Sequence, residues 1–153
     1  TVDSGTESLN TGAVYLFERS GAGVDSTWSQ KGFYFKPSNA SQNQQFGQAV
    51  SLSSSGNTLA VGAWGERSVA AGIGGNQDGE NLQGAGAVYV FGRPADSDSW
   101  QQLNYVKPSE QQANLFFGAK LDLAEDGRLL SVAGNGVRPD TFITGFAGFV
   151  YVY

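Results

Sequence analysis

The chain contains no cysteine, no methionine and no histidine. Without cysteine it forms no disulfide and offers neither a thiol nucleophile nor thiolate ligands for a metal ion. Without histidine it lacks the usual general base at neutral pH and the commonest ligand of transition metals. These absences exclude most thiol and zinc enzymes. They also leave little in the chain to oxidise, which suits an exposed location.

Charge and long apolar runs are scarce as well. The 153 residues include nine Lys and Arg against fourteen Asp and Glu, a net charge of −5. The basic residues are scattered singly, whereas nucleic-acid binding needs a clustered basic face, so we expect no nucleic-acid partner. No apolar run reaches the roughly eighteen residues of a membrane span, so we expect no membrane insertion. No N-terminal signal segment is visible, and we expect any targeting peptide to lie outside this sequence.

What the chain does contain is an internal repeat of about seventy residues. The segment 12–17, Gly-Ala-Val-Tyr-Leu-Phe, returns almost unchanged at 86–91 and again, with substitutions, at 148–153. Three further landmarks return 71 residues later, namely Lys36-Pro37-Ser38, Phe46-Gly47 and the segment 56–61. Trp28 and Trp100 are 72 residues apart, which predicts a one-residue insertion in the first copy, such as a β-bulge. Landmarks in one order at one period indicate a repeat architecture.

Each repeat predicts four short β-strands separated by Gly, Asn, Ser and Pro. We expect strands at 12–18, 28–36, 46–54, 58–63, 86–92, 100–107, 117–123, 128–133 and 147–153, with negligible helix because no segment has a period of 3.6. Apolar residues are consecutive in 58–63 and 86–91, so both faces of those strands must be covered. Polar and apolar residues mix in 100–107. Inner strands buried on both faces beside a half-exposed outer strand are typical of a β-propeller blade.

The landmarks resemble the FG-GAP repeat, the blade unit of integrin alpha-chain propellers and of many bacterial surface and secreted proteins. The residues that carry the resemblance are Phe46-Gly47, then 59–63, then 86–91. The proline of the family motif is replaced by Trp64, and the second copy reads Ala133-Gly134-Asn135. The resemblance implies four-stranded antiparallel blades with the Phe-Gly strand innermost and the Trp-bearing strand outermost.

The resemblance divides the chain into one complete blade and two partial ones. The partial blade 1–37 holds a third and a fourth strand, the complete blade is 46–107, and the partial blade 117–153 ends on a third strand. We therefore expect an incomplete propeller. Because a bare edge attracts other strands, we expect 147–153 to pair with a strand from outside this segment or to border further chain.

Many members of the family bind calcium in the loop between the first two strands of a blade, through closely spaced oxygen ligands. The first copy offers only Ser51, Ser53 and Ser55 there, and hydroxyls alone cannot offset the dehydration of a divalent ion. The second copy offers Asp122 and Asp126. We expect no calcium at the first loop, at most weak calcium binding at the second, and no other cofactor.

Ligand contacts are expected where the repeat is broken. Trp28 and Trp100 recur at the repeat period, which predicts packing between blades. Trp64 does not recur and follows an inner strand, so it is the candidate aromatic for a ligand, with Glu66 and Arg67 beside it. The long loop 64–85 adds Asn76 and Asp78 as candidates because long loops on a rigid scaffold often carry binding, although a flexible connector is the simpler interpretation.

No nucleophile–base pair can be assembled from a recognised motif, so we expect a protein that is not an enzyme. The leading hypothesis, implied by the resemblance, is an extracellular or cell-surface binding and adhesion module whose propeller loops meet a protein or glycan ligand; a periplasmic location stays open. One alternative is a structural subunit whose edge strands pair with other chains in an oligomer or filament. Another is an accessory domain of a larger secreted enzyme.

Overall fold

The computed structural model describes residues 10–79, 81–136 and 148–153, which form β-strands and one three-residue 3-10 turn at Gly23–Asp25. The strands are β1 (Val14–Ser20), β2 (Thr27–Phe35), β3 (Ala49–Leu52), β4 (Thr58–Ala63), β5 (Ala87–Gly92), β6 (Gln101–Val106), β7 (Lys120–Leu123), β8 (Leu130–Gly134) and β9 (Phe149–Val152). The predicted all-β class with negligible helix is confirmed.

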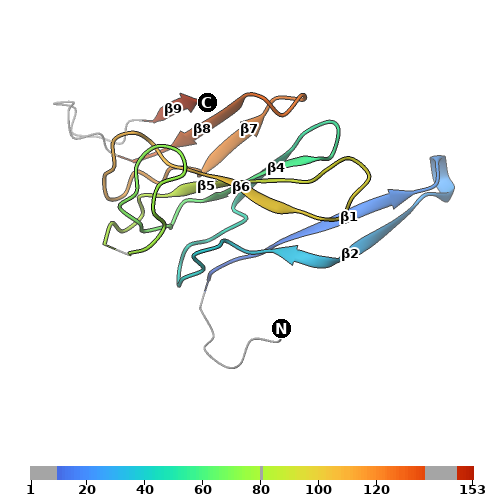
Figure 1. Ribbon diagram of the computed structural model, residues 1–153, viewed down its shortest axis with the longest axis horizontal. Helices are drawn as coiled ribbons and strands as arrows, with labels where there is room; N and C mark the ends of the chain where they lie inside the picture. Colours follow the sequence, from blue (N-terminus) through green and yellow to red (C-terminus); the bar gives the residue numbers. More distant parts are fainter. Residues whose placement is uncertain (1–9, 80, 137–147) are drawn as a thin grey trace.

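The strands form three antiparallel sheets that follow one another along the chain. The first is β1–β2, the middle sheet is β3–β4–β5–β6, and the last is β7–β8–β9. Figure 1 shows the three sheets side by side in chain order, from blue through green and yellow to red. Among the described residues the middle sheet has the four strands expected of a complete blade, the first sheet has two strands, and the last has three. The sheets are consistent with the predicted incomplete propeller.

The innermost strands begin later than the sequence predicts, at residues 49 and 120 instead of 46 and 117. Gly47 and Gly118 have φ angles of 94° and 86°, a left-handed conformation that interrupts an extended strand. The phenylalanine before each of these glycines leaves its own sheet and forms a parallel bridge to the preceding one, Phe46 with Gly12 and Phe117 with Gly86. The Phe-Gly landmark is therefore a junction between sheets.

The one-residue difference between Trp28 and Trp100 corresponds to irregular pairing in the outer strands. In the first sheet, Tyr15 pairs with Tyr34 and Phe17 pairs with Gln30, so two residues along β1 correspond to four along β2. In the middle sheet, Val90 pairs with Asn104 and Phe91 pairs with Gln102, so one residue along β5 corresponds to two along β6. The outer strand thus has two extra residues in the first sheet and one in the middle sheet. The predicted bulge is confirmed.

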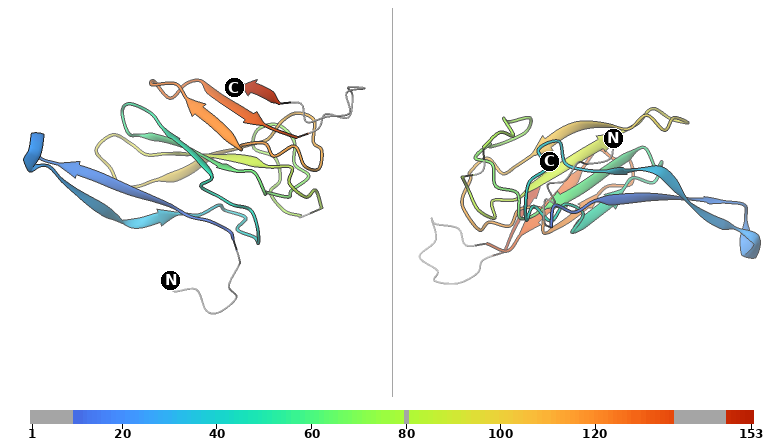
Figure 2. Two further views of the ribbon diagram at one scale, coloured as in Figure 1. Left: turned by 180° about the vertical axis from the view of Figure 1, so that it is seen from behind. Right: turned by 90° about the horizontal axis from the view of Figure 1, so that it is seen from below.

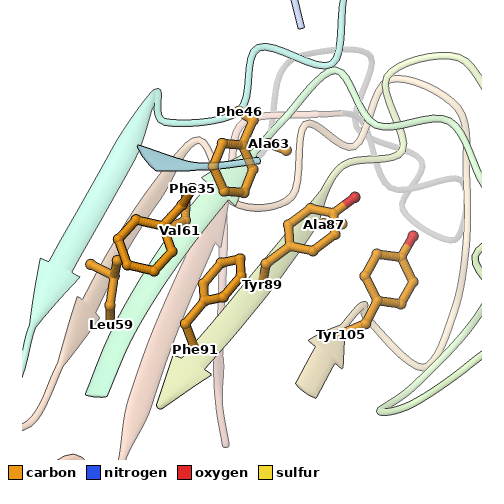
Figure 3. Packing of buried hydrophobic residues seen from close by; sticks show 9 residues of the cluster. All are labelled: Phe35, Phe46, Leu59, Val61, Ala63, Ala87, Tyr89, Phe91 and Tyr105. Atoms are coloured by element: carbon orange, nitrogen blue, oxygen red, sulfur yellow. The ribbon is translucent and has the colours of Figure 1, made fainter. Parts of the chain in front are cut away.

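Two apolar cores lie on opposite faces of the middle sheet. Val61 and Tyr89 belong to the core shared with the first sheet, while the adjacent residues Ala60 and Val88 belong to the core shared with the last sheet. All four are fully buried. In Figure 3 the rings of the first core gather over the face of β4 and β5. Alternate residues of one strand therefore pack into two cores, as the consecutive apolar runs predict.

The repeat tryptophans differ in their surroundings. Trp100 packs between the first two sheets, with its ring 5.2 Å from that of Phe35 and perpendicular to it. Trp28 is 67% exposed, so the prediction that it packs between blades is wrong for the described residues. The reason is position: Trp28 lies near the tip of the β1–β2 hairpin, which projects beyond the other sheets (Figures 1 and 2).

Candidate binding site around Trp64

Three connecting segments lie at one end of the sheets because the strands alternate in direction. They are the loop 64–85 between β4 and β5, the segment 36–48 after β2, and the segment 107–119 after β6. Figure 1 shows the loop 64–85 in green and the segment 107–119 in orange, at the end of the sheets away from the β1–β2 tip. Residues from all three segments surround Trp64.

Trp64 forms an aromatic pair with Phe116. Their ring centroids are 5.2 Å apart and the rings are nearly perpendicular, at 76°. Both side chains are half-buried. Trp64 comes directly after β4, and Phe116 precedes the Phe117-Gly118 junction of the next repeat. The pair therefore spans the boundary between the middle and the last sheet, and its position is fixed from both sides.

Two hollows flank this pair, and both rings line both of them. One has a volume of about 390 Å³ and the other about 380 Å³. The first is lined by Asn43, Gln45, Trp64, Gly65, Arg67, Gln83, Gly84, Asn114 and Phe116. The second is lined by Gln48, Trp64, Phe116, Ala119, Lys120 and Asn135. The surface thus combines two aromatic rings with carboxamides and two cationic side chains.

Unusual backbone conformations hold the Phe116 side of this surface. Asn114 and Phe116 have φ angles of 60° and 54°, and Gly84 has a φ angle of 64°. Gly84 accepts a hydrogen bond from the Phe116 amide at 2.8 Å, and a Cβ at Gly84 would lie 2.8 Å from the Phe116 ring. Glycine is therefore required where the ring passes. Asn43 and Gln45, 71 residues earlier, have φ angles of 61° and 54°, so the conformation belongs to the repeat and only the side chains are specific to this site.

Glu66 does not lie on this surface, which corrects the expectation that it orients a ligand. The side chain is 1% exposed and its Oε2 accepts a hydrogen bond of 2.6 Å from Nζ of Lys107, which is fully buried. Lys107 also donates to the carbonyl oxygen of Ser68 at 2.7 Å. Burial lowers the pKa of Lys107, and the nearby Glu66 carboxylate partly offsets that effect. Arg67, by contrast, lines the first hollow as predicted for a residue beside Trp64.

The buried ion pair is the centre of a polar network. Asn39 donates to Glu66 Oε1 at 3.1 Å and accepts from the Tyr89 hydroxyl, while the Tyr105 hydroxyl lies 2.6 Å from Ser68 Oγ. Figure 3 shows both tyrosine hydroxyls pointing the same way, out of the apolar core. Burial, reinforced by the nearby Glu66 carboxylate, raises the pKa of both tyrosines. The network fixes the start of the loop 64–85, and its ion pair between Glu66 and Lys107 is buried away from a ligand.

Backbone hydrogen bonds at Gly72 and Gly74 attach the middle of the loop 64–85 to the outer strand of the middle sheet and the residues after it. Gly74 N donates to the Tyr105 carbonyl at 2.8 Å, and Lys107 N donates to the Gly72 carbonyl at 2.9 Å. Beyond this attachment, Asn76 and Asp78 are exposed, and Asn76 Oδ1 accepts from the Asp78 amide at 3.0 Å. Neither residue lines the two hollows beside Trp64.

The two loops considered for calcium lie at the opposite end of the sheets and contact each other. Ser51 Oγ donates to Asp122 Oδ1 at 3.3 Å, and the Ser54 amide donates to the carbonyl oxygen of Glu125 at 2.9 Å. Asp126 Oδ1 accepts a hydrogen bond of 2.9 Å from the Arg128 amide. Both aspartates therefore have protein partners. Among residues 10–79, 81–136 and 148–153, no three acidic side chains gather as a cation cage.

Of the residues that the sequence offered as candidates, Trp64 and Arg67 line these hollows, whereas Phe116 and the carboxamides of the neighbouring segments were not among the candidates. A signal was present: Phe116 stands where the first repeat has Gln45, and Trp64 stands where the second has Asn135. An aromatic residue that departs from the repeat on each side of one junction indicates a local specialisation. The sequence does not show, however, that Trp64 and Phe116 contact each other, because that contact depends on how the middle and last sheets pack.

Comparison with known proteins identifies one similarity. The family model of the FG-GAP repeat matches residues 34–91, from the end of β2 through almost all of β5. Comparisons with curated proteins and with solved structures find no match. Within the described residues, no helix is long and apolar enough to cross a membrane.

Proposed function

Because the chain carries an FG-GAP repeat over residues 34–91, we propose that it is a non-catalytic binding module that presents Trp64 and its surroundings to a glycan. The observation that supports this most directly is the Trp64–Phe116 pair between two hollows lined with carboxamides. A binding role agrees with the β-propeller type of the module. The glycan and the residues that contact it are our proposal.

The chemistry of the surface favours a sugar. A sugar ring has an apolar face that packs on an aromatic ring, and its hydroxyls need donors and acceptors at the edge of that ring. Asn43 and Asn114 supply carboxamides that both donate and accept, and Arg67 supplies further donors. A large apolar protein contact would instead need a wider apolar surface than two half-buried rings.

A non-catalytic role is supported by where the ionisable groups are. The buried Glu66 carboxylate and Lys107 amine are paired with each other, and the tyrosine hydroxyls of the same network are buried. Such groups cannot reach a substrate bound beside Trp64. We place the module outside the cell or at its surface, because FG-GAP repeats are typical of such proteins and the chain has no thiol or thioether to oxidise.

A glycan array followed by calorimetry with the best binder tests the proposal. We expect W64A to weaken binding by about 30-fold or more, the effect of losing a central aromatic contact. The matched control is V24A, because Val24 is an exposed apolar side chain outside this surface. The proposal is overturned if no glycan binds, if W64A binds as the wild type does, or if V24A has the same effect.

A further inference from the structure

A group of aromatic side chains is exposed on one face of the first sheet. Tyr15 and Phe17 lie on β1, Trp28 and Tyr34 lie on β2, and they are 53%, 52%, 67% and 54% exposed. We call these four residues the aromatic face. So many large apolar side chains on one small sheet are uncommon on a monomer and indicate an interaction surface.

The repeat identifies the counterparts of these residues in the middle sheet. Tyr89, Phe91 and Tyr105 occupy the positions of Tyr15, Phe17 and Tyr34, and they are 0%, 6% and 2% exposed. Phe91 is covered by the first sheet, where the Phe35 ring of β2 lies 5.0 Å from it, while Tyr89 packs on Phe46 of the segment after β2 and on Tyr105. The aromatic face is therefore the equivalent face of the first sheet, left exposed by the described residues.

The innermost strands lead to the same conclusion. Val50 and Leu52 of β3 are 52% and 45% exposed, whereas their counterparts in β7 pack against the middle sheet. Those counterparts are Leu121 and Leu123. The side of the molecule that carries the aromatic face is thus uncovered on β3 as well.

The two interfaces between sheets within the chain show what kind of surface packs on an aromatic face. On the third strand of each blade, the residues that alternate with the aromatic ones are aliphatic, and they point to the other side of the sheet. Val14 and Leu16 of β1 pack on the core of the middle sheet, and Val88 and Val90 of β5 pack on the last sheet. The same packing, aliphatic residues over an aromatic face, occurs at both internal interfaces.

The last sheet carries an uncovered surface of this second kind. Val150 and Val152 of β9 occupy the positions of Val88 and Val90, and they are 66% and 63% exposed. We call these two residues the aliphatic face. The first and last sheets lie on opposite sides of the middle sheet (Figures 1 and 2), so the two faces of one copy cannot meet each other.

We propose that the aromatic face of one copy binds the aliphatic face of a second copy, which repeats between chains the packing that occurs twice within a chain. The contact is head to tail, since each copy uses a different surface. Such contacts close into a ring or continue as a filament, depending on the rotation between copies. This assembly does not depend on the glycan site, because Trp64 belongs to neither face.

Sedimentation velocity over a range of concentrations tests the contact, with one charge placed on each face. We expect the wild type to reach masses well above the 16.1 kDa of a single chain as its concentration rises. F17E blocks the aromatic face and V150E blocks the aliphatic face, and each variant alone should stay at 16.1 kDa. Both side chains are exposed in the monomer, so circular dichroism should show an intact fold. The matched control V24E changes a 99% exposed valine outside both faces and should associate like the wild type.

Mixing the two blocked variants gives the decisive result. F17E still has its aliphatic face and V150E still has its aromatic face, so an equal mixture should form a complex of one chain of each and grow no further. W64A should associate like the wild type. The proposal is overturned if the wild type stays monomeric, if the mixture stays monomeric, or if V24E also abolishes association.

Discussion

Two lysines at equivalent positions of the repeat have different roles. Lys107 is fully buried and pairs with Glu66, whereas Lys36, 71 residues earlier, is exposed and donates to the Gly12 carbonyl at 2.7 Å. The difference lies in the neighbouring segment, because the loop 64–85 passes over Lys107 and supplies the carboxylate. A motif that recurs in sequence thus acquires a buried charge in only one of its described copies.

Removing the amine of Lys107 should destabilise the protein strongly. In K107M the Glu66 carboxylate is left buried without its cation, and breaking a buried pair in this way costs about 3–5 kcal/mol. Urea unfolding measures the loss, and K36M is the matched control, expected to change the free energy of unfolding by less than about 1 kcal/mol. The double variant E66L/K107M should recover much of the loss, and equal costs for K107M and K36M would contradict the assigned role.

The buried tyrosines predict a loss of stability at alkaline pH. Burial raises the pKa of Tyr153 to about 12, with a contribution from Tyr151, and raises the pKa of Tyr89 and Tyr105 further. The unfolded chain ionises these tyrosines near pH 10, so above that pH the folded state holds more protons than the unfolded state. The free energy of unfolding should therefore fall as the pH rises above about 10.

Absorbance at 295 nm together with the fluorescence of unfolding checks this. We expect Tyr89 and Tyr105 to ionise only as the protein unfolds, so that Y89F removes part of the alkaline loss. Ionisation of every tyrosine near pH 10 in the folded protein would contradict the burial of these hydroxyls.

At the scale of elements, the junctions between sheets depend on single glycines. Gly86 has a φ angle of 81°, and a Cβ there would lie 2.1 Å from the carbonyl oxygen of Phe117 in the next sheet. G86A must therefore both strain its backbone and displace the junction. The control G23A has only the first cost, about 1–2 kcal/mol, because Gly23 has a φ angle of 63° and no atom within 4 Å.

We expect G86A to lower the free energy of unfolding by clearly more than G23A does. Thermal unfolding of both variants measures the difference. Hydrogen exchange should locate the extra loss at the Phe117 amide, which donates to the Ala85 carbonyl at 3.2 Å. Similar losses in the two variants would show that the close approach at Gly86 does not hold the sheets together.

The periodic part of the fold could be predicted from the sequence, because repeats and alternation report local pairing. The strand 58–63 was predicted with its observed bounds, and the other strands overlap their observed positions. The starts of β3 and β7 were placed three residues early, since a glycine in the left-handed conformation reads like any other glycine in a strand. Recurrence in the sequence does not report how far a hairpin projects beyond the other sheets, which is why Trp28 was expected to be packed although it lies exposed near the β1–β2 tip.

The candidate site was less predictable because it depends on contacts between segments that are far apart in the sequence. Trp64 was recognisable because it breaks the repeat, but Glu66 was expected beside it at the surface. Successive residues of an extended chain point to opposite sides, and in the loop after β4 the turn places Glu66 towards Lys107. Such a contact spans 41 residues of sequence, and residue types alone do not predict it.

In the whole molecule, each sheet depends on its neighbours. The middle sheet contributes to both cores through opposite faces of β4 and β5, while the first and last sheets each contribute to one. In a repeat architecture the free energy of unfolding is close to a sum over units and their interfaces. A substitution in the middle sheet should therefore affect stability more than the same substitution in an outer sheet.

Three valines at one position of the repeat allow this to be measured with the same chemical change. Val88 is fully buried between the middle and last sheets, Val14 is half-buried, and Val150 is 66% exposed. Deleting two buried methyl groups should cost about 2–3 kcal/mol in V88A, whereas V150A should cost under about 1 kcal/mol and V14A should lie between them. Urea unfolding at low protein concentration gives the order, and equal costs would contradict the arrangement of the two cores.

If copies associate through the aliphatic face, the cost of V150A should grow as the protein concentration rises, because association stabilises only the folded wild type. The cost of V88A relative to V14A should show no comparable growth, since neither side chain belongs to that face.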